Sequence, residues 1–176
     1  MNTSKQLKII TYSSLFVALI AAGAFLAIPI GPVPLVLQNM FVLLAGILLG
    51  PRWGIAAVGI YLLIGICGLP VFSQGRGGIG MIFGPTGGYL LGYLPAVFTA
   101  GLIAKFWNNK IIADISAMVA GSAIIYTTGI PWLKVVTGMG WGKALALGMY
   151  PFIIGDILKI IGAVYIAKTV RPYIKL

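Results

Sequence analysis

The chain has 176 residues, of which 60% are hydrophobic and 8% are charged, and its mean hydropathy is +1.09. This small number of polar groups cannot cover the surface of a soluble domain. The composition therefore indicates an integral membrane protein and excludes a soluble one. The formal net charge is +10, and the placement of that charge bears on topology, as described below.

Six apolar stretches approach or exceed the ~20 residues that a helix needs to cross a bilayer. In chain order they are Leu7–Ile28, Leu35–Leu49, Trp53–Gly68, Gly88–Phe106, Ile111–Ile130 and Ala144–Val170. The second and third are short, so they are tilted, short, or jointly broken around Gly50 and Pro51. No polar linker divides the chain. We therefore predict an all-α integral membrane protein in which residues 1–176 form one compact domain, a bundle of six transmembrane helices.

The first stretch carries small residues at every fourth position, namely Ser14, Ala18 and Ala22. Such a flat stripe lets another helix approach closely. It predicts either packing inside the bundle or a docking surface for a separate membrane subunit.

Three connections on one side of the predicted bundle are irregular: Pro29–Pro34, Leu69–Gly87 and Pro131–Lys143. Irregular backbone near a membrane persists only where protein buries it or where it lines a cavity. These connections therefore predict an outward-facing ligand cavity covered by loops. The second is the longest and is rich in glycine. A connection of this length is usually a lid or a binding loop, so we interpret its segment Gly75, Arg76, Gly77 and Gly78 as a lid. The G-x-G-x-x-G spacing there does not indicate a dinucleotide site, because the strand and the acidic residue of such a site are missing.

The basic residues are distributed unequally between the two sides. An even number of spans places both termini together, on the side that would hold Lys5, Lys8, Arg52, Lys105, Lys110, Lys168, Arg171 and Lys175. The opposite side would hold Arg76, Lys134 and Lys143. This asymmetry predicts that both termini are cytoplasmic. Because the excess charge is explained by topology, we expect no nucleic-acid partner.

Asp156 and Lys159 lie three residues apart inside the last apolar stretch. At this spacing on a helix the two side chains share a face and can hydrogen-bond, and an ionisable pair inside the membrane indicates a functional site. The other acidic residue, Asp114, is next to a basic loop where the bilayer surface would be. Asp156 is therefore expected to be the only buried anion.

Other polar residues flank the predicted cavity. The turn before the fourth stretch, with Thr86, Gly87 and Tyr89, offers free backbone N–H groups, a hydroxyl and a ring, and it can bind an anionic or carbonyl group. The turn can also be a Pro-Gly turn in which Thr86 caps the helix, and this does not exclude binding. Of Gln38 and Asn39, which point in different directions, one is expected to face the cavity.

Catalysis is not expected. The chain has no histidine, which removes the usual proton shuttle and transition-metal ligand, and its two carboxylates are too far apart in sequence to form a two-metal site. We predict no catalytic residues, no metal site and no cofactor.

Five blocks in this order resemble the BioY family, the biotin-specific substrate-binding component of energy-coupling factor (ECF) transporters. The blocks are Gly31-Pro32-Val33-Pro34 with Gln38, Gly68-Leu69-Pro70-Val71-Phe72, Gly84-Pro85-Thr86-Gly87-Gly88-Tyr89, Gly129-Ile130-Pro131-Trp132-Leu133, and Pro151-Phe152 with Gly155-Asp156-Ile157-Leu158-Lys159. The resemblance implies a six-helix capture subunit in the bacterial cell membrane. It also implies work with a transmembrane coupling subunit, onto which the small-residue stripe docks, and with two cytoplasmic ATPases. Arg76 departs from a lid that is otherwise almost all glycine.

Biotin fits the predicted site. Its ureido group has two N–H donors and one carbonyl, which suit Asp156 and Lys159. The apolar tail would lie against Phe72, Tyr89 and Trp132, with its carboxylate near Thr86 or the lid. The opposite assignment, with Lys159 on the ligand carboxylate, stays open. The alternatives are a capture subunit for another vitamin, a solitary secondary transporter with Asp156 as proton carrier, or a membrane-embedded enzyme.

Overall fold

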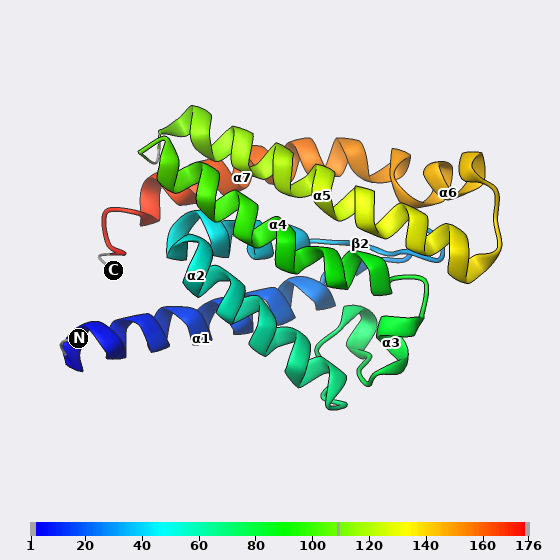
Figure 1. Ribbon diagram of the computed structural model, residues 1–176, viewed down its shortest axis with the longest axis horizontal. Coiled ribbons are helices and arrows are strands. Elements are labelled where there is room, and N and C mark those ends of the chain that lie inside the picture. The colour runs from blue at the N-terminus through cyan, green and yellow to red at the C-terminus, as the bar shows by residue number, and fades with distance from the viewer. Residues whose placement is uncertain (1–2, 109, 175–176) are drawn as a thin grey trace.

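The computed structural model describes residues 3–108 and 110–174 of the chain. They form α1 (Thr3–Phe25), β1 (Ala27–Ile28), β2 (Leu35–Val36), α2 (Gln38–Ile66), the 3-10 turn η1 (Ser73–Gly75), α3 (Gly80–Phe83), α4 (Gly87–Phe106), α5 (Ile111–Thr137), α6 (Trp141–Gly148) and α7 (Tyr150–Val170). The long helices run along one axis, and α1 begins at the same end of the molecule at which α7 ends (Figure 1).

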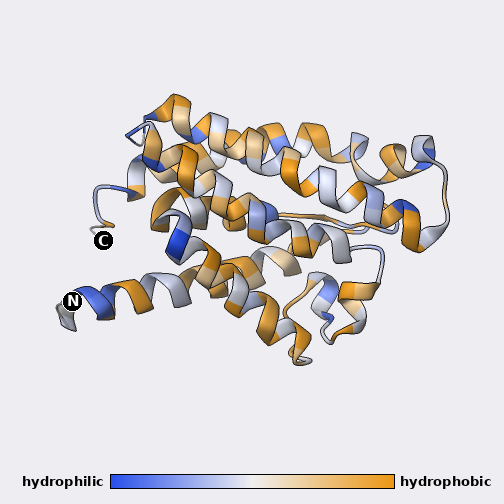
Figure 2. Cartoon of the chain, viewed as in Figure 1, coloured by the Kyte–Doolittle hydropathy of each residue, from blue (hydrophilic) through white to orange (hydrophobic). Residues whose placement is uncertain are grey.

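Several of the helices can cross a membrane. Among the described residues, five helical segments are long and apolar enough to do so: Lys5–Phe25, Gln38–Ile66, Gly87–Phe106, Ile111–Thr137 and Trp141–Val170. Figure 2 shows apolar residues along the length of these helices and hydrophilic ones at the two ends of the bundle. The chain is therefore a helical membrane protein.

The helix α2 is bent into two arms at Gly50. The backbone there has φ 77° and ψ 176°, a conformation open almost only to glycine, and Pro51 follows without an N–H for the helical ladder. The arms fold back on each other, since the side chain of Gln38 in the first arm donates to the Tyr61 hydroxyl in the second at 2.8 Å. The second and third predicted stretches are thus the two arms of one broken helix.

The predicted irregular connections are only partly correct. Residues 29–34 join β1 and β2, which pair antiparallel, and the second connection contains η1 and the single turn α3. The third prediction was wrong, because α5 continues through Pro131 to Thr137 and α6 begins at Trp141. Proline is tolerated inside membrane helices where neighbouring groups satisfy the carbonyl that it frees.

Glycine permits α4 to lie close to both of its neighbours, α2 and α5. A Cβ atom added at Gly101 would lie 2.8 Å from the Cα atom of Pro51, at the bend of α2. One added at Gly88 would lie 2.7 Å from the Thr128 carbonyl oxygen of α5. These contacts hold α4 at the centre of the bundle, with α2 and α5 on either side.

The small-residue stripe of α1 faces away from the rest of the chain. Ser14, Ala18 and Ala22 are exposed, whereas Phe16 and Ile20 on the opposite side are 3% and 0% exposed and belong to the core. Ordinary packing inside this bundle therefore does not explain the stripe.

Asp114 is buried, contrary to the expectation that Asp156 would be the only buried anion. It is 0% exposed, and both of its carboxylate oxygens accept from the guanidinium of Arg171, at 3.0 and 2.6 Å. The end of α7 brings that guanidinium against the first turn of α5, where a bidentate pair can compensate the lost hydration.

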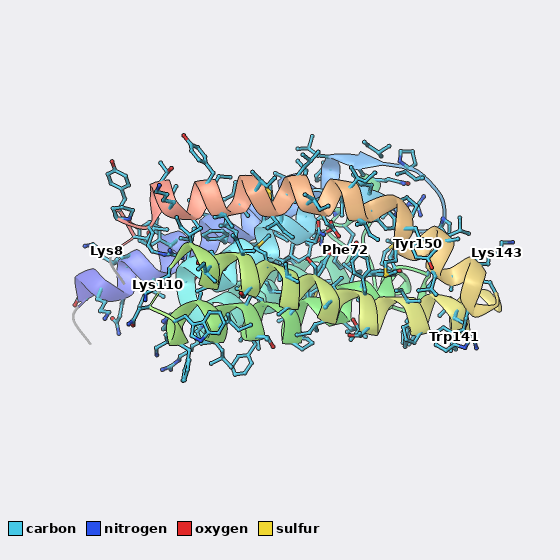
Figure 3. The ribbon with its side chains drawn as sticks, turned by 90° about the horizontal axis from the view of Figure 1, so that it is seen from above. Lys8, Phe72, Lys110, Trp141, Lys143 and Tyr150 are labelled. Atoms are coloured by element: carbon cyan, nitrogen blue, oxygen red, sulfur yellow. The ribbon has the colours of Figure 1, made fainter. Side chains whose placement is uncertain are left out.

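Three of the basic residues lie where the predicted asymmetry places them. Lys8 and Lys110 lie at the end of the bundle where α7 ends, and Lys143 lies at the other end (Figure 3). Lys175, which was assigned to the first group, lies outside the described residues.

Candidate functional site

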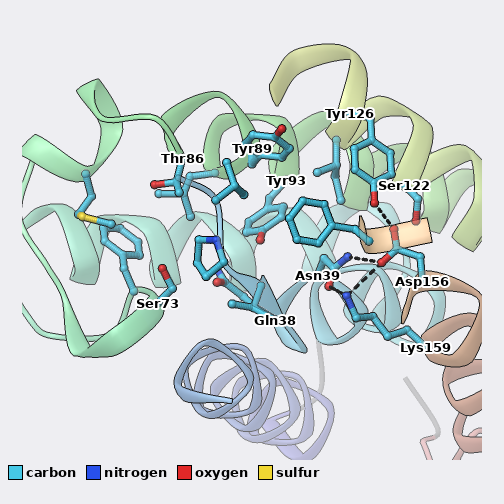
Figure 4. Close-up of a pocket in the computed structure, with 18 residues that line it drawn as sticks. Gln38, Asn39, Ser73, Thr86, Tyr89, Tyr93, Ser122, Tyr126, Asp156 and Lys159 are labelled. Carbon is cyan, nitrogen blue, oxygen red and sulfur yellow. Dashed lines mark hydrogen bonds and ion pairs between the residues drawn. The ribbon is translucent and has the colours of Figure 1, made fainter. Parts of the chain in front are cut away.

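A pocket lies among α2, α4, α5 and α7 and opens beside β2 and the connections next to it (Figure 4). Its inner part is formed by helix residues, including Asp156, Lys159 and Tyr126. Its mouth is formed by residues such as Val33 and Ser73 from the connections. Most of the lining is apolar, so the few polar groups determine what can bind there.

The polar groups at the inner end form one network around the predicted ion pair. Lys159 Nζ lies 3.0 Å from Asp156 Oδ1, and each residue is only 7% exposed. Asn39 in α2 bridges the pair, because its amide nitrogen donates to Asp156 Oδ1 at 3.2 Å and its oxygen accepts from Lys159 Nζ at 3.1 Å. The Tyr126 hydroxyl in α5 donates to Asp156 Oδ2. Three helices thus converge on one carboxylate.

This network leaves hydrogen-bonding capacity for a ligand. A carboxylate accepts about four hydrogen bonds and an ammonium donates three. Asp156 accepts from three groups, and Lys159 donates to two oxygens. The Asn39 oxygen accepts one of about two possible bonds. The inner end therefore retains two acceptor sites, one on Asp156 and one on Asn39, and a donor on Lys159.

A second buried hydrogen-bond chain supports the wall of the pocket. Gln38 is 2% exposed and donates to Tyr61, whose hydroxyl donates to the Val71 carbonyl at 3.0 Å. The Tyr61 ring meets Phe72 edge-on, with ring centroids 5.6 Å apart. Both Gln38 and Asn39 line the pocket, although only one of them was expected to do so.

The predicted residues near the mouth divide into two groups. Phe72, Thr86 and Tyr89 line the pocket, and the Tyr89 hydroxyl donates to the Gly148 carbonyl at 3.0 Å. Gly87 and Trp132 are not among the lining residues. The Trp132 indole instead donates to the Gly84 carbonyl at 3.0 Å. This hydrogen bond stabilises the turn that precedes α4.

Thr86 occupies the cap position of α4 without acting as a side-chain cap. The residue has φ −89° and ψ −8°, and its side chain makes no capping hydrogen bond. Thr86 is thus the N-cap residue of α4, as one interpretation of the sequence has it, but its side chain takes no part in capping.

The predicted lid segment does not itself line the pocket. Arg76 is exposed and donates to the Gln74 side chain at 2.9 Å, while its backbone carbonyl accepts from the Phe72 N–H at 2.9 Å. Gly75 and Gly78 have positive φ, and Gly77 packs too closely on the Leu69 carbonyl to carry a Cβ atom. The connection reaches the pocket through its neighbours Phe72, Ser73 and Met81.

Four polar lining residues were not identified from the sequence: Ser73, Tyr93, Ser122 and Tyr126. The three that lie on long helices have a recognisable sequence pattern. Tyr93 follows Tyr89 by four residues, and Ser122 precedes Tyr126 by four, so each pair shares one face of an apolar helix. Polar side chains repeated on one face of a membrane helix indicate a face turned to the bundle interior.

The fold and this site together define a class: a helical membrane protein that encloses a pocket for a small molecule, with an ion pair at its inner end. The sequence model that describes the BioY family matches residues 1–176 of the chain. The chain therefore belongs to the BioY family, and the resemblance found in its sequence is confirmed.

Individual relatives support the assignment. The chain is 43% identical over 164 residues to the probable biotin transporter BioY of Pyrococcus horikoshii, covering 93% of this chain and 96% of that protein. It is 40% identical over 159 residues to the biotin transporter BioY of Thermotoga maritima, covering 90% and 93%. A crystal structure described as the S-component for biotin from an ECF-type ABC transporter matches with a TM-score of 0.91 and 34% identity, covering 98% of this chain and 95% of that one.

Proposed function

We propose that this protein captures biotin from outside the cell as the substrate-binding subunit of an ATP-driven ECF-type transporter. The relatives are transporters by name, and the similar crystal structure is of a biotin S-component. The observation that carries the proposal is the buried set of unused hydrogen-bonding sites around Asp156 and Lys159.

A cyclic urea needs two acceptors for its N–H groups and one donor for its carbonyl. The inner end of the pocket offers acceptor sites on Asp156 and Asn39 and a donor on Lys159. These are charged or amide groups with little exposure, where hydrogen bonds are strongest and where an unmatched ligand is rejected most strongly. The ureido ring of biotin matches this set.

The ion pair also favours one orientation of the ligand. A ligand carboxylate placed on Lys159 would lie beside Asp156, whose Oδ1 is 3.0 Å from the same ammonium, and like charges so close repel each other. We therefore place the ureido ring at the inner end. The tail lies along Phe72 and Tyr89, and its carboxylate lies near Thr86 and Ser73 at the mouth.

The proposed topology has six spans. They are α1, the two arms of α2, α4, α5 and α7, and this order returns both chain ends to the same side. The basic end of the bundle would face the cytoplasm. The pocket mouth lies beside β2 and α3, at the opposite end in Figure 1, so the cavity would open outward.

The proposed partners are a transmembrane coupling subunit and two cytoplasmic ATPases. The exposed stripe of Ser14, Ala18 and Ala22 supports a docking role for α1, because small residues on a lipid-facing surface allow close approach of another helix.

Isothermal titration calorimetry of purified, ligand-free protein with biotin tests the proposal. We expect saturable binding that is weakened about tenfold to a hundredfold in Lys159→Met and retained in Lys134→Met. The control removes a lysine that lies over the Trp141 ring, outside the pocket. Biotinamide, which lacks the carboxylate charge, tests the orientation. If Lys159 binds the ureido carbonyl, biotinamide and biotin should bind Lys159→Met equally weakly. If Lys159 binds the ligand carboxylate instead, biotinamide should bind this variant better than biotin does. No heat with biotin at several temperatures would refute the proposal.

A further inference from the structure

A groove lies between the start of α5 and the end of α7, at the basic end of the bundle. It is lined by Lys110, Lys168 and Arg171 and by the apolar side chains of Ile111, Ile112 and Pro172. The groove shares no lining residue with the ligand pocket. It therefore needs an explanation of its own.

The charge of this groove is not balanced by the chain's own acidic side chains. The sequence contains only two acidic residues. Asp156 is paired with Lys159, and Asp114 is paired with Arg171. No side-chain carboxylate is left for Lys110 and Lys168, both of which are exposed. These two lysines are therefore open to an anion from outside the chain.

The apolar part of the groove indicates which anion this is. Ile111 and Ile112 are 47% and 70% exposed, and they begin a membrane-crossing helix directly after Lys110. Cationic groups at the end of a membrane helix, next to exposed aliphatic side chains, are complementary to a lipid phosphate and the acyl chain below it. A soluble phosphate would leave the aliphatic side chains uncovered.

The Asp114–Arg171 pair gives the groove a fixed shape. The two-pronged contact, at 2.6 and 3.0 Å, ties the end of α7 to the first turn of α5. Lys168 lies three residues before that arginine, on the same side of the helix. We propose that this groove binds one anionic phospholipid, with its phosphate on Lys110 and Lys168 and an acyl chain along Ile111 and Ile112.

Native mass spectrometry of the full chain in detergent tests this proposal with phosphatidylglycerol as the probe and phosphatidylcholine as the neutral comparison. We expect one retained phosphatidylglycerol on the unmodified protein and weak retention of phosphatidylcholine. Lys110→Ala with Lys168→Ala should lower phosphatidylglycerol affinity by about tenfold or more, since each lysine near an anionic headgroup contributes to attraction.

The matched control is Lys5→Ala with Lys8→Ala, which removes two exposed lysines at the same end but outside the groove. It should retain the lipid. Equal losses in both double variants would overturn the proposal, because the lipid would then follow net charge alone. Glycerol phosphate that displaces bound phosphatidylglycerol as effectively as added phosphatidylglycerol does would also overturn it. So would unchanged lipid binding in Lys110→Ala with Lys168→Ala, whether or not assembly of a transporter complex is impaired. Thermal unfolding of each variant checks the fold without reference to biotin.

Discussion

The buried pair Asp156–Lys159 permits a test in which stability and binding respond in opposite ways. Asp156→Asn and Lys159→Met each leave one charge without its partner in a site where both residues are 7% exposed. Breaking a buried ion pair from one side typically costs about 3 to 5 kcal/mol. Replacing both residues removes both charges, so the double variant should unfold at a higher temperature than either single variant.

The remaining network sets the size of each effect. In Asp156→Asn the ammonium keeps the Asn39 oxygen and an amide oxygen, and in Lys159→Met the carboxylate keeps Asn39 and Tyr126. These contacts should hold each cost near the lower limit, at about 3 kcal/mol. Binding behaves differently. Each lost hydrogen bond to a charged group costs about 1.5 to 3 kcal/mol, which is roughly tenfold to a hundredfold in Kd.

Thermal unfolding in detergent and calorimetry with biotin measure the two quantities on the same preparations. We expect the double variant to recover stability and to remain without detectable binding. A double variant whose destabilisation equals the sum of the two single effects would refute the reasoning, because independent residues add whereas a coupled pair does not. So would a double variant that binds biotin normally.

Three further substitutions test the fold by the same unfolding measurement. Gly88→Ala should destabilise by about 1 to 3 kcal/mol, because its Cβ atom would meet a backbone oxygen 2.7 Å away, and the control Gly162→Ala, with nothing within 4 Å, should stay within about 1 kcal/mol. Gly50→Ala should cost about 1 to 3 kcal/mol through backbone strain alone, since its side chain has room, and an unchanged midpoint would refute the argument from strain. Tyr61→Phe removes both the acceptor of Gln38 and a donor to the adjacent loop, and we expect a loss of about 1 to 3 kcal/mol, against which a neutral result would argue for replacement by water.

The central pair of the site was predictable because it depends on local geometry alone. Asp156 and Lys159 are three residues apart on one helix, so the sequence specifies their contact whatever the rest of the fold does. Their burial followed from the apolar residues around them. Thr86 and Tyr89 were identified from the turn that precedes the fourth apolar stretch, and Phe72 from the blocks that resemble the family; all three line the pocket.

The rest of the network depends on how distant helices meet. Asn39 reaches Asp156 across 117 residues of sequence and Tyr126 reaches it across 30, and no local pattern states these pairings. Asp114 was misjudged for the same reason. Its charged partner is Arg171, which lies 57 residues away in sequence.

The assignment of Trp132 to a loop failed for a different reason. Pro131 was interpreted as the end of a helix, because proline lacks the N–H that the helical ladder uses. In this bundle α5 continues for six residues beyond it. The side of α5 packed on α4 decides the matter, since Trp132 lies against Gly88 and donates to the Gly84 carbonyl. Tertiary contacts of this kind outweigh a local helix-breaking signal.

The two acidic residues have a common role in the way α7 is attached. Among the described spans, the segment containing α7 is the least buried, with 28% of its apolar window inside the protein. In lipid, apolar side chains gain little from leaving one apolar environment for another, so packing and polar contacts hold helices together. Both carboxylates of the chain serve this purpose: Asp156 in α7 binds side chains of α2 and α5, and Asp114 in α5 binds Arg171 at the end of α7. A ligand bound between Asn39 and Lys159 therefore adds to the attachment of α7 at the point where the helix is already held, which links occupancy of the pocket to the packing of the bundle.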